Sequence, residues 1–216
     1  MNWIRFSYKA LQYAHTLAFS RIYNIMFKLL LAINGIKVGR NLKCFNSVPS
    51  LQINRHAGLV CIGNQVTFNS YGDQSWNSKC KLIVLAGATM TIGDDSGMNG
   101  VMIYCSKEIR IGRNVKIGGG SRISDSNHHS LNYKERRTKE DSKCAKSTPI
   151  IIGDDVFIGA NCYIGKGVSI GDRSIVAAGS VVVKSIPADE VWGGSPARFI
   201  KKINEKYDNL NNYSNI

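Results

Sequence analysis

Aliphatic residues recur at every sixth position in the second half of the chain. They head the hexads IGDDVF, IGANCY, IGKGVS, IGDRSI, VAAGSV and VVKSIP, which begin at Ile152, Ile158, Ile164, Ile170, Val176 and Val182. The same period appears upstream from Ile111 to Ile123, and less regularly at Ile62 and Ile92. A period of six would carry an apolar residue around the surface of an α-helix, so the pattern predicts short strands instead.

The hexads predict an all-β solenoid. If three hexads make one triangular coil, each aliphatic side chain points inward and stacks on its counterpart in the next coil. Gly, Asn and Asp supply the tight corners between the strands. The repeat covers most of residues 58–184, so one long β-helix accounts for most of the chain.

Three regions follow from this pattern. We expect a helical segment over residues 1–36, a β-helix over 37–186 with an irregular lead-in to about residue 57, and a C-terminal segment over 187–216. Within the last segment we expect a short helix at 196–207, followed by a polar, frayed tail.

Composition adds constraints on partners. The chain has 216 residues, of which 44% are hydrophobic, so one domain can bury a sizeable core. Its 28 Lys and Arg against 15 Asp and Glu give a net charge of +13, which favours anionic partners. We see no nucleic-acid recognition motif and expect no nucleic-acid partner. Six widely spaced cysteines without a CxxC motif are typical of reduced thiols in a cytoplasmic protein.

Residues 1–36 are rich in aromatic and aliphatic side chains, but their densest run, 22–33, is too short and too polar to predict a membrane span. Basic residues interleave with the aromatic ones, which is compatible with a helix on an anionic membrane surface. A helix packed on the main domain or on a neighbouring subunit is an equal alternative. We therefore expect a cytoplasmic protein, with peripheral contact to the inner face of the plasma membrane as one option.

A long loop at about 124–149 interrupts the repeat with the sequence SDSNHHSLNYKERRTKEDSKCAKSTP. A solenoid has no packing reason to extrude such a loop, which makes it a functional candidate. It holds His128 and His129, two of the four histidines in the chain. Imidazole is the side chain whose ordinary pKa suits a general base near neutral pH. Two solvated side chains in a mobile loop are the alternative.

The hexads and the stretch from Pro149 to Lys202, which ends in GGSPARFIKK, resemble the hexapeptide-repeat acyltransferases. They are similar to the branch of maltose, galactoside and nodulation O-acetyltransferases. The resemblance implies a left-handed parallel β-helix, a homotrimer with active sites in clefts between subunits, and acetyl-CoA as co-substrate without a metal. It implies O-acetylation of a sugar or of a surface-polysaccharide precursor; N-acetylation of an amino sugar, free or nucleotide-linked, is the alternative.

The family carries a His followed by a small residue, an aliphatic residue and Asp or Asn, with an Arg a few places later. HSLNYKERR matches when its first residue is His129, which the resemblance makes the general base. It would take the proton of the acceptor hydroxyl as the oxygen attacks the thioester, without an acyl-enzyme intermediate. The match places Asp125, Asn127 and His128 near the acceptor. Arg136 is expected to meet a phosphate on the acceptor or to be solvated.

The resemblance also assigns groups that stabilise charge and place the acceptor. The backbone N–H of Ala160, which follows the turn in VFIGA, would hold the developing oxyanion. Relatives have Trp in this turn where this chain has Phe157. Asn99 matches an Asn that helps to place the acceptor, although a corner Asn that serves only the turn is an equal interpretation.

Acetyl-CoA carries a 3′-phosphate and a pyrophosphate, so its site requires cations and exposed backbone donors. The resemblance runs the pantetheine arm along the small corner residues Gly159, Ala160, Ala177 and Ala178. It places the nucleotide near three cations, Lys184, Arg198 and Lys201. Each cation alone is also compatible with a solvated surface charge.

Two other functions are compatible with a left-handed β-helix. Carbonic anhydrases of this fold bind Zn²⁺ through three spaced histidines, whereas this chain has only His15, His56 and the adjacent pair His128 and His129. A non-catalytic solenoid for binding or assembly would explain the repeat, but not the HSLN loop together with the SPARFIKK ending. The basic, apolar N-terminus adds lipid-linked oligosaccharides to the expected acceptors.

Overall fold

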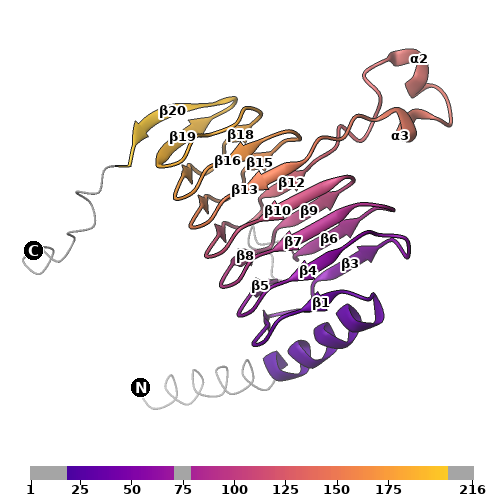
Figure 1. The fold of residues 1–216 in the computed structure, drawn as a ribbon, viewed down its shortest axis with the longest axis vertical. Helices are drawn as coiled ribbons and strands as arrows, with labels where there is room; N and C mark the ends of the chain where they lie inside the picture. Colours follow the sequence, from indigo (N-terminus) through magenta and orange to yellow (C-terminus); the bar gives the residue numbers. More distant parts are fainter. Residues whose placement is uncertain (1–18, 71–78, 204–216) are drawn as a thin grey trace, which may run out of the picture.

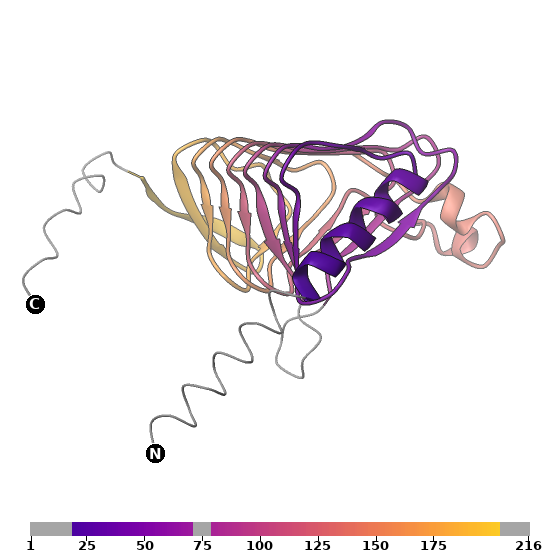
Figure 2. The same ribbon diagram turned by 90° about the horizontal axis from the view of Figure 1, so that it is seen from below.

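The structure is a computed structural model that describes residues 19–70 and 79–203. These residues form a left-handed parallel β-helix of triangular cross-section, as predicted (Figures 1 and 2). Apart from the last two strands, neighbouring strands within a sheet are three strands apart along the chain, so each coil contributes one strand to every side. We name the sides sheet A, sheet B and sheet C, in the order in which each coil visits them.

The strands and helices have the following bounds. Sheet A contains β1 (Lys37–Val38), β4 (Val60–Ile62), β7 (Thr89–Ile92), β10 (Glu108–Ile111), β13 (Ile150–Ile152) and β16 (Ser169–Ile170). Sheet B contains β2 (Lys43–Phe45), β5 (Thr67–Asn69), β8 (Gly97–Asn99), β11 (Lys116–Ile117), β14 (Phe157–Ile158), β17 (Ile175–Val176), β19 (Glu190–Gly194) and β20 (Ala197–Lys202). Sheet C contains β3 (Ser50–Ile53), β6 (Lys81–Val84), β9 (Met102–Cys105), β12 (Arg122–Ser124), β15 (Tyr163–Ile164) and β18 (Val181–Val182). The short helices α2 (Tyr133–Arg136) and α3 (Asp141–Cys144) lie between β12 and β13.

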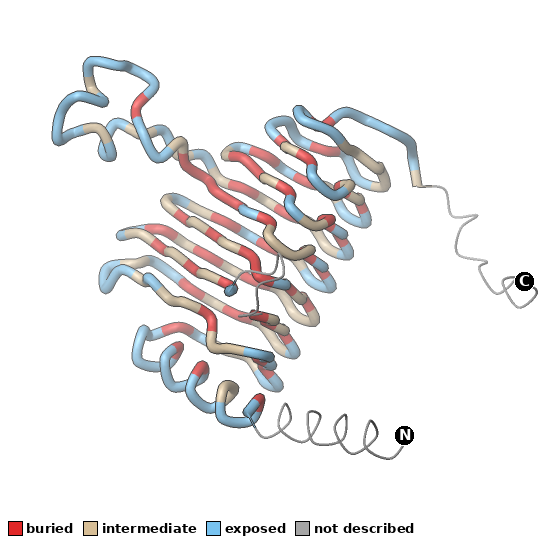
Figure 3. Tube along the Cα trace, turned by 180° about the vertical axis from the view of Figure 1, so that it is seen from behind, coloured by how far each residue is buried: buried red, intermediate tan, exposed pale blue. Residues whose placement is uncertain are grey.

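The core is a set of stacked apolar columns. In sheet A, the strand registers place five buried isoleucines side by side: Ile62, Ile92, Ile111, Ile152 and Ile170. Fully burying one such side chain contributes about 1.5–3 kcal/mol. Outward-pointing residues lie between the inward ones, which gives the alternation of buried and more exposed positions in Figure 3. The hexad period is therefore the spacing of the inward positions.

The corners bring the backbones of successive coils close together. A Cβ atom added to Gly112 would lie 2.5 Å from the carbonyl oxygen of Gly153 in the next coil. Ten described residues other than Gly have a positive φ angle, and seven of these are Asn or Asp, such as Asn114 and Asp155. The corner geometry therefore requires the Gly, Asn and Asp residues that separate the aliphatic positions in the sequence.

An N-terminal helix, whose described part covers residues 19–33, lies across the first coil (Figure 2). Phe27 and Leu31 on its inner side are buried, and the Phe27 ring packs edge-on against Phe68 at a centroid distance of 5.2 Å. The helix thus closes the N-terminal end of the core. Residues 1–18 of the expected helical segment lie outside the described residues.

The C-terminal segment differs from the prediction. We expected a short helix at 196–207, but Ala197–Lys202 form β20, which pairs antiparallel with β19. Strand β19 itself extends sheet B beyond β17. The open edge of sheet B offers hydrogen-bond partners to this segment, and that tertiary pairing outweighs the local helix propensity of ARFIKK. Residues 204–216, which include the end of the expected helix and the expected frayed tail, lie outside the described residues.

Candidate active site

The long loop leaves the stack between β12 and β13, at the edge of the prism where sheet C leads into sheet A (Figure 1). We name this the C/A edge. The two arms of the loop pair at its base. The Thr148 N–H donates to the Asp125 carbonyl at 2.9 Å, and the Asn127 N–H donates to the Lys146 carbonyl at 3.1 Å. This neck holds the tip of the loop, with α2 and α3, outside the core.

His129 lies in this loop and pairs with Asp141, a residue that the sequence analysis did not select. The Nδ1 atom of His129 is 2.6 Å from Oδ2 of Asp141, at the start of α3. The other carboxylate oxygen, Oδ1, accepts a 2.8 Å hydrogen bond from the backbone N–H of Ser130. Because both oxygens are engaged, the carboxylate holds the imidazole ring in one orientation.

These contacts determine which nitrogen of the ring is basic. Hydrogen bonds from His129 and Ser130 lower the pKa of Asp141, so its carboxylate is charged near neutral pH and can only accept. Nδ1 of a neutral His129 therefore carries the proton, and Nε2 holds the lone pair. The His129 side chain is 69% exposed, and Nε2 has no hydrogen-bond partner among the described residues. The ring can accept a proton at Nε2 from a group that approaches from outside.

A second network fixes the backbone beside His129. The Ser130 hydroxyl donates to the Glu135 carboxylate, and this hydrogen bond lowers the pKa of Glu135. Arg136 donates from Nη1 to the carbonyl oxygens of Ser130 at 2.7 Å and of Leu131 at 2.9 Å. The Arg136 guanidinium, which we expected to meet a phosphate or to be solvated, thus braces the loop after His129.

His128 is oriented differently from its neighbour. Its backbone has a φ of 64°, and its side chain turns back toward the prism. Nε2 of His128 lies 3.0 Å from the Ser124 hydroxyl, and its ring centroid lies 4.3 Å from that of Tyr104. Of the two histidines, His129 has the ring that is both oriented by a carboxylate and open at Nε2, which favours it as the general base.

Asp125 supports the base of the loop. Its side chain is fully buried, and its carboxylate accepts hydrogen bonds of 2.7, 2.7 and 2.8 Å from the backbone N–H groups of Ser106, Lys107 and Glu108. We expected Asp125 to lie near the acceptor, but its side chain does not reach the surface of the single chain. Asn127, for which we expected the same role, is half-buried at the neck.

The residues expected to line the acetyl-CoA site lie on a second edge, where sheet B leads into sheet C. Gly159 and Ala160 follow β14, and Ala177 and Ala178 follow β17 one coil later. A Cβ atom at Gly159 would lie 2.5 Å from the amide nitrogen of Ala178, so only Gly fits there. The backbone N–H of Ala160 makes no hydrogen bond to a described residue. These four residues form a stretch of the B/C edge with no side chain longer than a methyl group.

The remaining candidates divide between the two edges. Asn99 is exposed at the end of β8, on the B/C edge two coils before Ala160. Arg198 and Lys201 lie on β20, beside the extension of sheet B. Lys184 follows β18 and therefore lies on the C/A edge, with the long loop.

The single chain does not bring the candidate base and the candidate oxyanion donor together. His129 extends from the C/A edge, whereas Ala160 lies on the B/C edge. The five residues after Ala160 that cross sheet C extend about 17 Å, at roughly 3.3 Å per residue. The two groups of one copy are therefore too far apart to act on one carbonyl group.

Asp141 is the functional candidate that sequence reasoning missed. It follows His129 by 12 residues in a stretch without periodicity, so spacing gave no reason to pair the two. The pairing depends on how α2 and α3 fold back beside the neck, and only the acidic start of the run EDSK pointed to a carboxylate there.

The side chains of the described residues do not support the zinc-dependent alternative. Across the part of the chain that the structure describes, no group of three or more His, Cys, Asp or Glu side chains could hold a metal ion. His128 and His129 contact different partners, and His56 lies in an earlier coil, where its ring accepts from Arg55.

Some known proteins match most of this chain, and others match only a short stretch of it. The family profile described as "Hexapeptide repeat of succinyl-transferase" matches residues 149–184. The galactoside O-acetyltransferase of Escherichia coli (strain K12) is 33% identical over 163 residues, which cover 75% of this chain and 75% of that protein. A solved galactoside acetyltransferase in complex with coenzyme A has a TM-score of 0.50 and 28% identity, covering 74% of this chain and 67% of that chain.

A shorter stretch is more similar to a different enzyme. The 2,3,4,5-tetrahydropyridine-2,6-dicarboxylate N-acetyltransferase of Clostridium perfringens (strain SM101 / Type A) is 58% identical over 59 residues, or 27% of this chain. The match spans 25% of that relative, so this chain covers about a quarter of its length. The relatives thus include both O- and N-acetyltransferases.

Proposed function

Because the chain belongs to the hexapeptide-repeat acetyltransferase family, we propose that it transfers an acetyl group from acetyl-CoA to a hydroxyl of a sugar. The His129–Asp141 pair carries this proposal, because it offers an oriented imidazole that is open to solvent. A hydroxyl is a weak nucleophile until a base removes its proton, and the pair can supply that base. Asp141 positions the ring and stabilises the imidazolium that forms.

The reaction requires a proton to move twice. Nε2 of His129 takes the proton of the acceptor hydroxyl as the hydroxyl oxygen forms a bond to the thioester carbonyl carbon. The Ala160 N–H donates to the carbonyl oxygen while negative charge develops on it. The carbon–sulfur bond breaks, and the imidazolium gives its proton to the departing thiolate. His129 thus returns to its starting state without being acylated.

In this proposal the complete site lies between copies of the chain in a homotrimer. The support is the separation of His129 on the C/A edge from Ala160 on the B/C edge. When two copies pack side by side, the long loop of one can reach the B/C edge of the other. A three-fold arrangement makes three equivalent contacts of this kind, with no unpaired loop.

The B/C edge is suited to the slender pantetheine arm of acetyl-CoA. The column of Gly159, Ala160, Ala177 and Ala178 leaves room for an extended chain to lie against the backbone. Arg198 and Lys201, at the end of sheet B, can attract the phosphates. Lys184 lies on the other edge, so it would reach the nucleotide from the neighbouring copy.

The acceptor in this proposal is a precursor of a bacterial surface polysaccharide, held on lipid at the cytoplasmic face of the plasma membrane. The net charge of +13 and the basic, apolar N-terminal segment support that location. The second candidate is N-acetylation, which the similarity to an N-acetyltransferase favours, and we propose an amino sugar as its acceptor. An amine that must lose a proton can use the same base.

The test is turnover of acetyl-CoA across a panel of sugars, amino sugars and lipid-linked sugars, measured as release of the CoA thiol. We expect acetylation of a hydroxyl, which gives an ester that dilute alkali cleaves. An alkali-stable amide would favour the amino-sugar alternative. Failure to release CoA thiol with any acceptor, while acetyl-CoA still binds, would contradict acetyl transfer to a sugar.

A further inference from the structure

The N-terminal end of the prism carries an exposed apolar surface. On the helix over residues 19–33, the side opposite the buried Phe27 is apolar along its whole described length, and Ile25, Leu29 and Ile33 are 61%, 58% and 80% exposed. We name this surface the apolar helix face; it consists of Phe19, Ile22, Ile25, Met26, Leu29, Leu30 and Ile33. The other side of the helix packs on the core, so this face points away from the coils.

The same end of the chain has no acidic residue. The first Asp or Glu is Asp73, so residues 1–72 hold eight Lys and Arg and no Asp or Glu. None of the described cations in this region forms an ion pair with a described residue. A third of the chain therefore supplies +8 of the net charge of +13.

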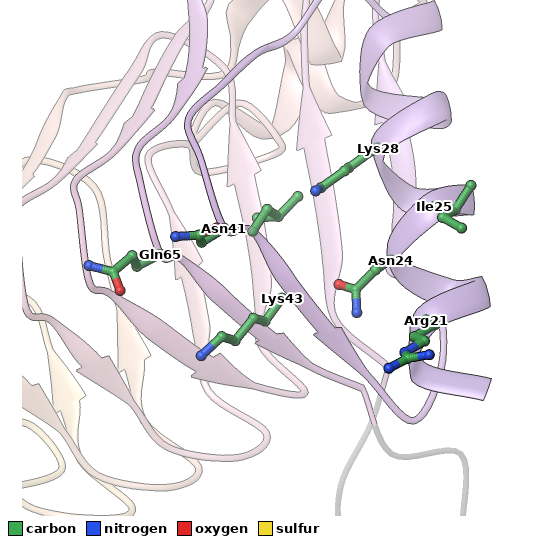
Figure 4. Close-up of a pocket in the computed structure, with 8 residues that line it drawn as sticks. Arg21, Asn24, Ile25, Lys28, Asn41, Lys43 and Gln65 are labelled. Atoms are coloured by element: carbon green, nitrogen blue, oxygen red, sulfur yellow. The ribbon is translucent and has the colours of Figure 1, made fainter. Parts of the chain in front are cut away.

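Three of these cations line one pocket between the helix and β2. Arg21 and Lys28 extend from the helix and Lys43 from β2, around an open pocket of ≈ 460 Å³ (Figure 4). The remaining lining residues are Asn24, Ile25, Asn41, Leu42 and Gln65. Cations and amide donors without a carboxylate suit a phosphate group. Because Ile25 belongs to both surfaces, the pocket adjoins the apolar helix face.

We infer that this end docks on an anionic phospholipid bilayer. The apolar helix face enters the boundary between headgroups and acyl chains, while Arg21, Lys28 and Lys43 hold a headgroup phosphate. An apolar helix side flanked by cations is typical of helices that lie in a membrane interface, where long basic side chains reach the headgroups. A protein partner is a poorer match, because Lys is depleted at the centre of protein interfaces.

Docking by this end leaves the rest of the molecule accessible. The helix lies across the N-terminal end of the stack, whereas α2, α3 and the strands of the later coils lie away from that end (Figure 1). A bilayer at the helix would therefore leave the long loop and the residues around Ala160 accessible. Among the described residues no helix is long and apolar enough to cross a bilayer. A protein docked in this way would lie beside an acceptor held on lipid. The inference rests on the proposed function only for that acceptor. Vesicle binding itself requires no acetyl transfer.

The test is flotation of the full-length protein with vesicles of equal parts phosphatidylcholine and phosphatidylglycerol, and with vesicles of phosphatidylcholine alone. We expect strong binding to the anionic vesicles, weakened by salt. Lys28→Gln with Lys43→Gln should weaken binding about twenty-five-fold, since each cation near an anionic surface contributes about fivefold. Leu29→Ser should weaken it about tenfold through lost apolar burial.

Matched controls separate this surface from general charge and hydrophobicity. Lys202→Gln changes a cation on β20, at the opposite end of the stack, and Leu59→Ser changes an exposed apolar residue outside the helix (Figure 1). Both should bind like the native chain. If the Lys28→Gln, Lys43→Gln double variant and Leu29→Ser bound vesicles as well as the controls do, the inference would be overturned. Equal binding of the native chain to both vesicle types would overturn it too. A helix variant that changes the oligomeric state but not flotation would identify the face as a contact between copies instead.

Discussion

Replacing Asp141 by Asn tests how the loop prepares its base. The Asp141 carboxylate accepts from His129 Nδ1 at 2.6 Å and from the Ser130 N–H at 2.8 Å. An amide is neutral and can also donate, so it no longer stabilises the imidazolium and allows the ring to place its proton on Nε2. Both changes weaken the base while its position in the loop is kept.

The size of the expected loss in kcat follows from how exposed the His129 and Asp141 side chains are. Replacing the buried Asp of a serine-protease triad by Asn costs about ten-thousandfold in kcat. Here the side chains of His129 and Asp141 are 69% and 18% exposed, so water replaces part of the lost interaction. Residues that orient a functional group from behind typically contribute about tenfold to a hundredfold. We expect a loss of about that size in kcat for Asp141→Asn, with the KM for acetyl-CoA unchanged.

The assay is steady-state release of CoA thiol as a function of pH, with thermal unfolding as the check on folding. Because the pKa of Asp141 is lowered, its carboxylate contact is present above the ordinary Asp range and is lost only as pH falls through the lowered value. Asp141→Glu, which keeps the charge on a longer side chain, should recover part of the rate. A normal kcat for Asp141→Asn across the pH range would refute the positioning role.

Other predictions test the remaining parts of the account. Ala178→Trp should fill the B/C edge and raise the KM for acetyl-CoA at least tenfold, and isothermal titration with CoA would measure the loss of binding. Mixed, refolded trimers of Ala178→Trp and His129→Ala should regain about a quarter of the native rate, because some sites then combine two intact edges; no recovery would argue against a shared site. Asp125→Ala should destabilise the fold by about 3 kcal/mol in urea unfolding, since three backbone N–H groups lose the buried carboxylate that accepts from them. Burial raises the pKa of Cys44 and Cys105 to about 12, so a thiol reagent at mildly alkaline pH should label them only after denaturation.

Much of the fold could be predicted from the sequence because the inward positions are both periodic and aliphatic. The first coils are less visible, since the same inward column of sheet B holds Cys44, Phe68 and Met98 before it reaches Ile117. Phe68 packs against Phe27 of the helix, and all three residues keep the register, so the structural period persists where the sequence period fades. The strand at Ala197–Lys202 could not be predicted, because its partner is a sheet edge that only the folded solenoid provides.

Individual residues of the candidate site could be predicted from the sequence, but the contacts between them could not. The break in the hexads located the loop, and the HSLN pattern selected His129. Asp141 orients its ring and Arg136 holds the backbone that follows it, and the loop brings both residues back through turns that follow no period. Asp125 had the residue type of a substrate ligand, but its burial beneath the loop became evident only with the neighbouring coil in place.

The most direct test of the account compares acetyl-CoA turnover by the native chain, His129→Ala and His128→Ala, with CoA binding measured in parallel. We predict that His129→Ala loses transfer by at least a hundredfold while it still binds CoA, because the lost group is a general base and is not among the residues expected to bind acetyl-CoA. His128→Ala should keep most of the rate, since its ring contacts Ser124 and Tyr104. Full activity without His129, or loss of activity only without His128, would contradict the assignment of the base.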